Sequence, residues 1–149
     1  MVMNRIMIAA IALVATIFSV SADDRHIAAD QLPDAAKTFI AKYFASQKIT
    51  YATVDRGIID SEYNVRLEDG SKIECDGDGR WMEIERRGAA VPAPIIPAPL
   101  ASYVRENYPD AVVVKIERDR NSTELTLLNQ TKHIELKFDG QNRLIDIDD

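Results

Sequence analysis

Apolar residues recur with two periods along the chain, and the first of these periods predicts helices. In the segment LPDAAKTFIAKYF, residues 32–44, the apolar residues fall on one stripe of a helix. The stripe consists of Phe39, Ile40, Tyr43 and Phe44. The segment IPAPLASYVRENY, residues 96–108, predicts a second helix, which Pro109 ends.

After each predicted helix the period falls to two, which is typical of half-buried antiparallel strands. Residues 63–67 and 82–84 alternate between apolar and polar in the first half of the chain. The same alternation occurs in the second half within residues 112–116, 125–127, 134–138 and 145–147. Turn residues such as Asp69-Gly70 separate the runs and predict hairpins.

The two halves of the sequence resemble each other at a nearly constant offset. Pro33 matches Pro97, and the Asp-Gly pair at residues 76–77 matches the pair at residues 139–140. We therefore predict an α+β fold made by tandem duplication of a helix plus four-stranded antiparallel unit. The repeats cover about residues 30–86 and 95–149, with the helices packed on one face of a shared twisted sheet. A proline-rich stretch, residues 86–100, joins them.

The N-terminus has the pattern of a secretory signal peptide. Arg5 precedes an apolar run over residues 6–20, and Val20-Ser21-Ala22 fits signal peptidase. A membrane anchor is the alternative, but the run is about 15 residues long and a span needs roughly 20. We predict a signal peptide at residues 1–22 and a mature domain at residues 23–149, exported to the periplasm or secreted, with no membrane anchor after cleavage.

Charge and cysteine content narrow the possible partners. Of the 18 basic residues only Arg5 lies in the signal segment, so 17 basic and 24 acidic residues remain, a net charge of −7. Such a surface repels nucleic acid and anionic membranes. Cys75 is the only cysteine, so the domain contains no internal disulfide and depends on its core.

The segment SKIECDGDGRWMEIE, residues 71–85, contains the candidate chemistry. Asp76 and Asp78 resemble the start of a calcium loop, but Arg80 and Trp81 stand where that loop needs an oxygen ligand and glycine. A hairpin turn is the favoured interpretation. Cys75 alternates in phase with Ile73, which favours a core position over a reactive thiol. No catalytic motif is present, so we predict neither an enzyme nor any bound cofactor or metal.

Strand phase also predicts which residues lie on the sheet face opposite the helices, a candidate partner surface. Trp81 alternates with Met82 and is placed on that face, where it either packs against a neighbouring strand or anchors a partner. The predicted partner-binding residues are Tyr51, Arg66, Trp81, Glu83, Lys115 and Leu144. The other residues placed on this face are Thr53, Asn64, Glu117 and Thr126.

Several of these runs together resemble a known family. They are "LP..A..FI..YF", "Y.V.L.DG..IE.D..G.W..I", "VP..I.P..L..YV..NYP.A.V.KIE.D" and "EL.L.N......FD". From about Leu32 to the C-terminus the chain resembles the PepSY-like, putative β-lactamase-inhibitor-like family of exported envelope proteins. The resemblance implies a tandem α/β unit that binds a protein through the free face of its sheet.

The sequence and the resemblance together predict a function without catalysis. We expect a periplasmic protein-binding module that inhibits or regulates an envelope hydrolase, with a protein partner in the cell envelope. A module that binds a small ligand or a peptide, through the sheet face or an edge strand, is the alternative.

Overall fold

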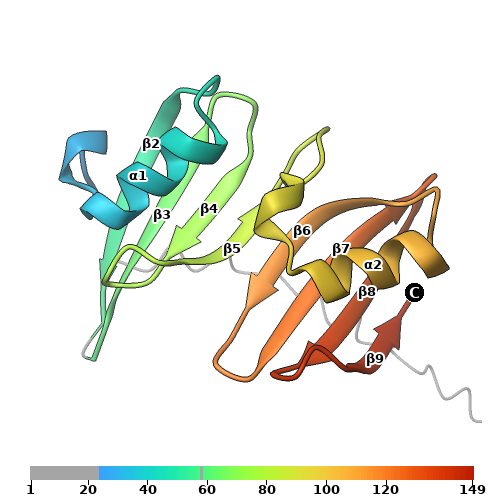
Figure 1. Cartoon of the computed structure of the whole chain (residues 1–149). Coiled ribbons are helices and arrows are strands. Elements are labelled where there is room, and N and C mark those ends of the chain that lie inside the picture. Colours follow the sequence, from blue (N-terminus) through green and yellow to red (C-terminus); the bar gives the residue numbers. More distant parts are fainter. Residues whose placement is uncertain (1–23, 58) are drawn as a thin grey trace, which may run out of the picture.

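The structure, a computed structural model, describes residues 24–57 and 59–149 (Figure 1). The predicted signal peptide therefore lies outside the described residues. The strands are β1 (Arg25–His26), β2 (Ile49–Arg56), β3 (Ser61–Leu67), β4 (Lys72–Cys75), β5 (Trp81–Glu85), β6 (Val112–Arg118), β7 (Ser122–Asn129), β8 (Lys132–Asp139) and β9 (Leu144–Asp148). The helices are α1 (Asp34–Tyr43) and α2 (Ala98–Asn107), with 3₁₀ turns η1 (Ala29–Gln31) and η2 (Ala93–Ile95).

All nine strands form one antiparallel sheet in which spatial order follows sequence order from β1 to β9. The fold is α+β, but the predicted tandem duplication of a helix plus four-stranded unit was wrong. The structure is mostly a single nine-stranded sheet with two short helices. A shared sheet was predicted, but β5 pairs directly with β6, so the strands continue as one sheet and do not divide into two units.

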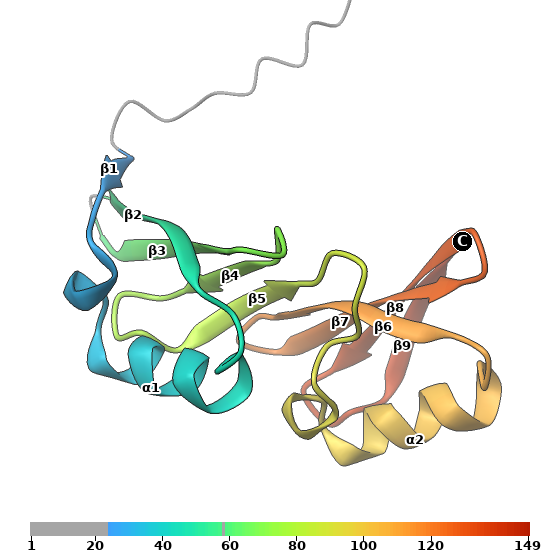
Figure 2. The ribbon, with the colours of Figure 1, turned by 90° about the horizontal axis from the view of Figure 1, so that it is seen from above.

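Both α-helices pack on the same face of this sheet, and no described helix covers the other face (Figure 2). The helix α1 buries Ala36 and Ile40 against the sheet, and α2 buries Leu100 and Val104. These pairs are four residues apart, so each helix turns one narrow apolar stripe toward the core. No helix of the described part is long and apolar enough to cross a membrane.

The core of the sheet is a row of buried apolar residues that runs across seven strands in register. From β2 to β8 the row reads Ala52, Val65, Ile73, Ile84, Ile116, Leu125 and Leu136. Fully burying one such large side chain stabilises the fold by about 1.5–3 kcal/mol. The row continues through the β5–β6 contact, so one core spans the whole sheet.

The strands β5 and β6 are joined by only three register pairs, and the connecting segment strengthens this contact. The backbone N–H of Arg86 donates to the carbonyl of Val114, and that of Val91 donates to the carbonyl of Val113. The Arg86 guanidinium also lies 3.3 Å from the Asp69 carboxylate. The proline-rich link is therefore held against the sheet.

The Asp-Gly-Asp-Gly run forms the β4–β5 hairpin turn, as predicted. One carboxylate oxygen of Asp76 accepts hydrogen bonds from the backbone N–H groups of Asp78 and Arg80, at 3.0 and 2.9 Å. The other oxygen accepts from the Arg80 side chain at 2.9 Å. Gly79 has φ of 83°, and a Cβ there would lie 2.7 Å from the Cβ of Pro33. Glycine is therefore required both by the backbone and by the close approach of α1.

The sheet has two edges, and they are protected differently. At one edge β1 pairs with β2 at only two positions, Val54 and Thr53. At the other edge β9 has no outer neighbour among the described strands. There the Asp146 carboxylate accepts a hydrogen bond from the N–H of Ile147, which occupies a backbone donor that another strand would need.

Candidate functional site

The candidate site is the face of the sheet that no described helix covers, which we call the free face (Figure 2). Two transverse rows of side chains cross it, because residues directly opposite on neighbouring strands share a face. The first row reads Tyr51, Arg66, Lys72, Glu85, Lys115, Thr126, Glu135 and Asp148. The second row reads Thr53, Asn64, Glu74, Glu83, Glu117, Glu124, Lys137 and Asp146.

Four glutamates stand side by side in the second row, one on each strand from β4 to β7. Like charges directly opposite one another destabilise a sheet, so this arrangement needs compensation. Two lysines of the first row provide it. Lys72 pairs with Glu74 and lies 3.8 Å from Glu83, and Lys115 lies 3.5 Å from Glu83 and 3.4 Å from Glu117.

Glu83 is the centre of this ion-pair network. Only 13% of its side chain is exposed, against 50% for Glu117, because both lysines reach over it. Burial, assisted by the charge of Glu74, raises the pKa of the Glu83 carboxyl above its ordinary value, and the two lysines partly oppose the rise.

The two lysines of the network hold their protons more firmly than usual. Burial lowers the pKa of Lys115, but the charges of Glu83 and Glu117 outweigh burial and the pKa is raised. Burial likewise lowers the pKa of Lys72, and the hydrogen bond and charge of Glu74 outweigh it. The centre of the free face is therefore a set of closely paired carboxyl and lysine side chains.

Trp81 and Leu144 do not lie on the free face, and their predicted placement was wrong. A register shift on β4–β5 sets Trp81 opposite the buried Cys75, and a shift on β8–β9 sets Leu144 opposite the buried Phe138. Each shift is a β-bulge next to a hairpin turn, and a bulge of one residue moves the following side chain to the other face. Both residues pack, partly buried, against the core on the helix side.

On the helix side Trp81 contacts Phe39 and Arg118. Its ring stacks on Phe39 of α1, with ring centroids 6.2 Å apart. The Arg118 guanidinium lies 3.9 Å from the centroid of the Trp81 ring, and its Nε donates a 2.7 Å hydrogen bond to the Trp81 carbonyl. These contacts describe a packing role, while the binding of a partner by Trp81 stays an untested prediction.

The other predicted partner-binding residues lie on the free face. Glu83 and Lys115 are in direct contact, and Tyr51 is opposite Arg66 in the register. The Tyr51 side chain is 46% exposed, and its ring packs edge-on against His26 of β1 at a centroid distance of 4.5 Å.

Thr53 differs from the other residues that the sequence placed on this face. Thr53 is only 2% exposed, so its side chain is unavailable to a partner. Sequence reasoning also missed charged residues on the same face, among them Lys72, Glu74, Glu124, Glu135 and Lys137. Each of them alternates with a buried apolar neighbour, so the same period of two would have found them.

Cys75 is fully buried on the opposite, helix-facing side, as predicted. Burial raises the pKa of its thiol to about 12, with a smaller contribution from the charge of Asp76. A thiol with this pKa is almost entirely protonated at neutral pH, which is the unreactive form.

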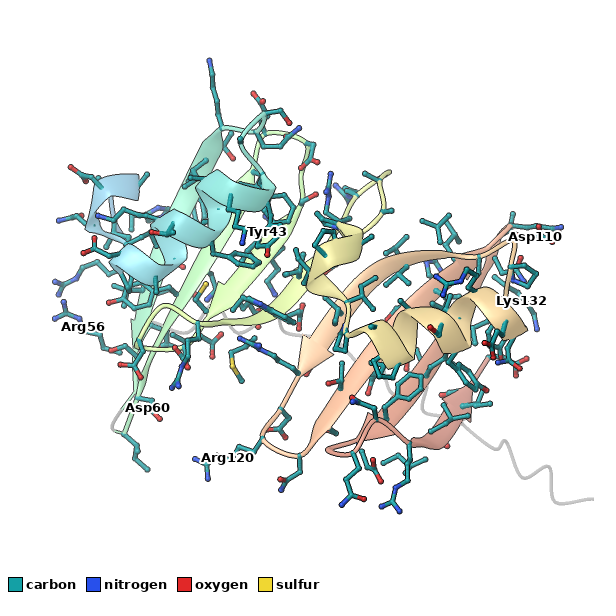
Figure 3. All side chains as sticks on the ribbon, viewed as in Figure 1. Tyr43, Arg56, Asp60, Asp110, Arg120 and Lys132 are labelled. Carbon is teal, nitrogen blue, oxygen red and sulfur yellow. The ribbon has the colours of Figure 1, made fainter. Side chains whose placement is uncertain are left out.

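The free face has two depressions at its margins. One has a volume of about 670 Å³ and lies among hairpin turns, where Asp60 and Arg120 border it (Figure 3). Carboxylates and arginines both line this depression. The second is a dent of about 120 Å³ on β7–β9, and its lining consists of Glu124, Glu135, Lys137, Asp146 and Asp148.

The chain is similar to a known protein family and to several solved structures. The family described as "Putative beta-lactamase-inhibitor-like, PepSY-like" matches residues 61–146. The chain belongs to this family. No curated protein matches the chain.

Three solved structures of similar proteins carry the same fold. A putative calcium-regulated periplasmic protein from Bacteroides thetaiotaomicron is 41% identical, with a TM-score of 0.80 over 85% of this chain and 98% of that one. A putative periplasmic protein from Bacteroides vulgatus is 40% identical, with a TM-score of 0.82 over 87% of this chain and 99% of that one. A putative periplasmic protein of unknown function, also from Bacteroides vulgatus, is 32% identical, with a TM-score of 0.78 over 85% and 99%.

Proposed function

We propose that this PepSY-like protein is a non-enzymatic periplasmic module that binds a protein partner through the free face of its sheet. By this proposal it inhibits or regulates an enzyme of the cell envelope, in keeping with the inhibitor-like family. The observation that carries the proposal is the one-sided architecture: both α-helices lie on one face of the sheet (Figure 2), and ion-paired side chains lie on the other.

The size of the free face supports a protein partner. The nine strands average six residues. With about 4.8 Å between strands and about 3.4 Å per residue, they give a face of roughly 900 Å². A stable protein interface buries about 800 Å² on each partner, so the free face could supply one side of such an interface. Its paired charges also suit recognition, because electrostatic complementarity favours specific partners and disfavours wrong ones.

The charges of the free face are held in place before any partner arrives. The Glu83 carboxylate is fixed between two lysines, so little side-chain freedom is lost there on binding. An exposed Tyr51 near the β1 edge offers an aromatic contact, and tyrosine is enriched among interface hot spots.

Site-specific photo-crosslinking tests this function. A photoreactive amino acid would replace Thr126, a half-buried residue of the free face, and as a matched control Arg105, an exposed residue of α2. We expect a protein adduct from position 126 in the periplasm of the native bacterium and none from position 105. Adducts from position 105 alone, or from neither position, would contradict the proposal.

Export through a cleaved signal peptide is part of this proposal. The three similar structures are of proteins described as periplasmic, and the apolar run over residues 6–20 fits a signal. N-terminal sequencing of protein from the periplasm should start at Asp23. Recovery of the intact chain with Met1 in a membrane fraction would reject cleavage.

Binding of a small ligand or a peptide is the second candidate. It is favoured by the depression of about 670 Å³, whose lining includes Arg118, Arg120 and Glu62 and therefore offers partners for both charge signs. Native mass spectrometry of protein purified from its own periplasm tests this. A retained small molecule that is released by denaturation would favour this candidate over a protein partner.

The Bacteroides thetaiotaomicron protein is described as a putative calcium-regulated periplasmic protein. Within the described part of this chain, no group of three or more His, Cys, Asp or Glu residues is placed to hold a metal ion. Asp76, the residue that most resembles a calcium ligand in sequence, has both carboxylate oxygens engaged by its own turn. We therefore do not extend calcium regulation to this chain.

A further inference from the structure

We propose that the partner presents a basic protein segment, carrying lysine or arginine side chains, to the part of the free face formed by β7, β8 and β9. We call this part the acidic end of the free face. The inference rests on the proposed function, because it names the chemistry of the partner that the function requires.

The first argument is the uneven pairing of charges across the free face. On β4–β6 the lysines Lys72 and Lys115 form ion pairs with Glu74, Glu83 and Glu117. The acidic end has one cation, Lys137, among four carboxylates. These carboxylates belong to Glu124, Glu135, Asp146 and Asp148, and within the described residues none of them forms an ion pair.

The second argument is the shape of the acidic end. The four carboxylates and Lys137 line a dent of about 120 Å³, so the charges surround a concave spot and not a ridge. Glu135 and Asp148 are directly opposite in the register, and Lys137 is opposite both Glu124 and Asp146. Opposite residues lie about 5 Å apart, so one guanidinium or ammonium group in the dent would reach two or more carboxylates.

The third argument is an apolar pair on the free face, one residue pair away from the lining of the dent, which favours a protein over a free cation. Val112 of β6 is opposite Leu128 of β7, and Leu128 lies two residues beyond Thr126 on the free face. Val112 is 43% exposed. A polyamine or a metal ion would leave this pair in water, whereas a protein segment that sets a cation in the dent can cover it with a neighbouring apolar side chain.

Partners that carry negative charge are disfavoured at the acidic end. Nucleic acid and an anionic membrane surface would place phosphates against Glu124, Glu135, Asp146 and Asp148 with only Lys137 to receive them. A basic segment instead relieves the repulsion among the carboxylates, and this gain is absent for a neutral segment.

Binding of a model peptide tests the chemistry directly. The probe is a fluorescent peptide of alternating lysine and threonine, measured by anisotropy with the mature protein in low-salt buffer. The controls are the same peptide with serine in place of lysine, and spermidine as a competitor. We expect the lysine peptide to bind at least about tenfold more tightly than the serine peptide and to weaken as salt is added.

Charge-reversed variants locate the binding. The test variant carries Glu135→Lys and Asp148→Lys on the acidic end. The matched control carries Glu106→Lys and Asp110→Lys, two exposed residues that give the same change of net charge outside the free face. We expect affinity for the lysine peptide to fall about tenfold in the test variant and less than about twofold in the control. If the test variant does not fold, Glu135→Gln with Asp148→Asn replaces it, with a smaller loss expected.

Three outcomes would overturn the inference: equal losses in test and control variants, equal affinity for lysine and serine peptides, or displacement by spermidine as effective as by unlabelled peptide. The photo-crosslinking at position 126 separates this failure from failure of the proposed function. An adduct that forms equally well in the Glu135→Lys and Asp148→Lys variant would keep the protein-binding function and reject the basic partner. Loss of the adduct in the Glu135→Lys and Asp148→Lys variant, but not in the control variant, supports both the protein-binding function and the basic partner.

Discussion

Removal of the Trp81 side chain should destabilise the protein, because the ring is a packing element between the sheet and α1. Trp81→Ala deletes the stack on Phe39 and the contact with the Arg118 guanidinium. Truncation of a buried tryptophan costs about 3–5 kcal/mol, and the partial exposure of this ring places it at the lower end. The cation–π contact contributes about 1 kcal/mol of that loss. We expect the free energy of unfolding to fall by about 3 kcal/mol.

The assay is urea denaturation followed by far-ultraviolet circular dichroism, because Trp81 is the only tryptophan and its removal eliminates the fluorescence signal. Tyr51→Ala is the matched control: Tyr51 is also aromatic but is 46% exposed on the free face. Loss of its edge-on contact with His26 should cost about 1 kcal/mol or less.

A double-mutant cycle between Trp81→Ala and Phe39→Ala isolates the stacking contact. We expect a coupling energy of about 0.5–1.5 kcal/mol, the range for aromatic pairs in contact. If Trp81→Ala loses no more stability than Tyr51→Ala, and the cycle shows no coupling, then Trp81 does not pack on α1. The placement of Trp81 by the β-bulge would then be refuted.

The remaining predictions concern the turns and the thiol. Gly79→Ala should lower the free energy of unfolding by about 3 kcal/mol, because the new Cβ would lie 2.7 Å from Pro33. Gly88 also has a positive φ but has open space around it, so Gly88→Ala should cost only about 1–2 kcal/mol. Urea melts that rank the two variants equally would contradict the close approach of Pro33 to Gly79. Cys75 should resist a thiol reagent at pH 8 until denaturant is added, and fast native labelling would remove it from the core. Hydrogen bonds and the Arg80 charge outweigh burial and hold the folded pKa of Asp76 below its ordinary 3.8. Its stabilising effect is therefore present above that pH and lost as the pH falls further, so thermal melts from pH 5 to pH 2 should show a smaller acid loss for Asp76→Asn than for wild type.

Local sequence patterns predicted the strands and part of the free face. Alternation of apolar and polar residues is a local property of a strand, so it placed Tyr51, Arg66, Glu83 and Lys115 on the face where the structure has them. It did not predict that the shared sheet is joined through β5 and β6. The β5–β6 contact joins residues on both sides of a long link. The alternation of apolar and polar residues within one strand contains no information about such a contact.

The errors at Trp81 and Leu144 have a common physical cause. A β-bulge changes the phase of a strand by one residue, and strand phase was the only basis for their placement. A signal was present in the sequence, because Trp81-Met82 and Leu144-Ile145 are both adjacent apolar pairs at the start of a strand. Two apolar neighbours cannot both face the core of a regular strand, so such a pair after a tight turn indicates a bulge.

The order of the strands has a consequence for how the chain folds. The strands from β2 to β9 each pair with the strands next to them in sequence, so every pairing except β5–β6, which spans the link and α2, closes a short loop. Short loops have a small entropic cost of closure, and folds dominated by local contacts form quickly. A chain that emerges from a narrow channel with its N-terminus first can therefore add hairpins in the order in which they arrive, without waiting for its C-terminal residues.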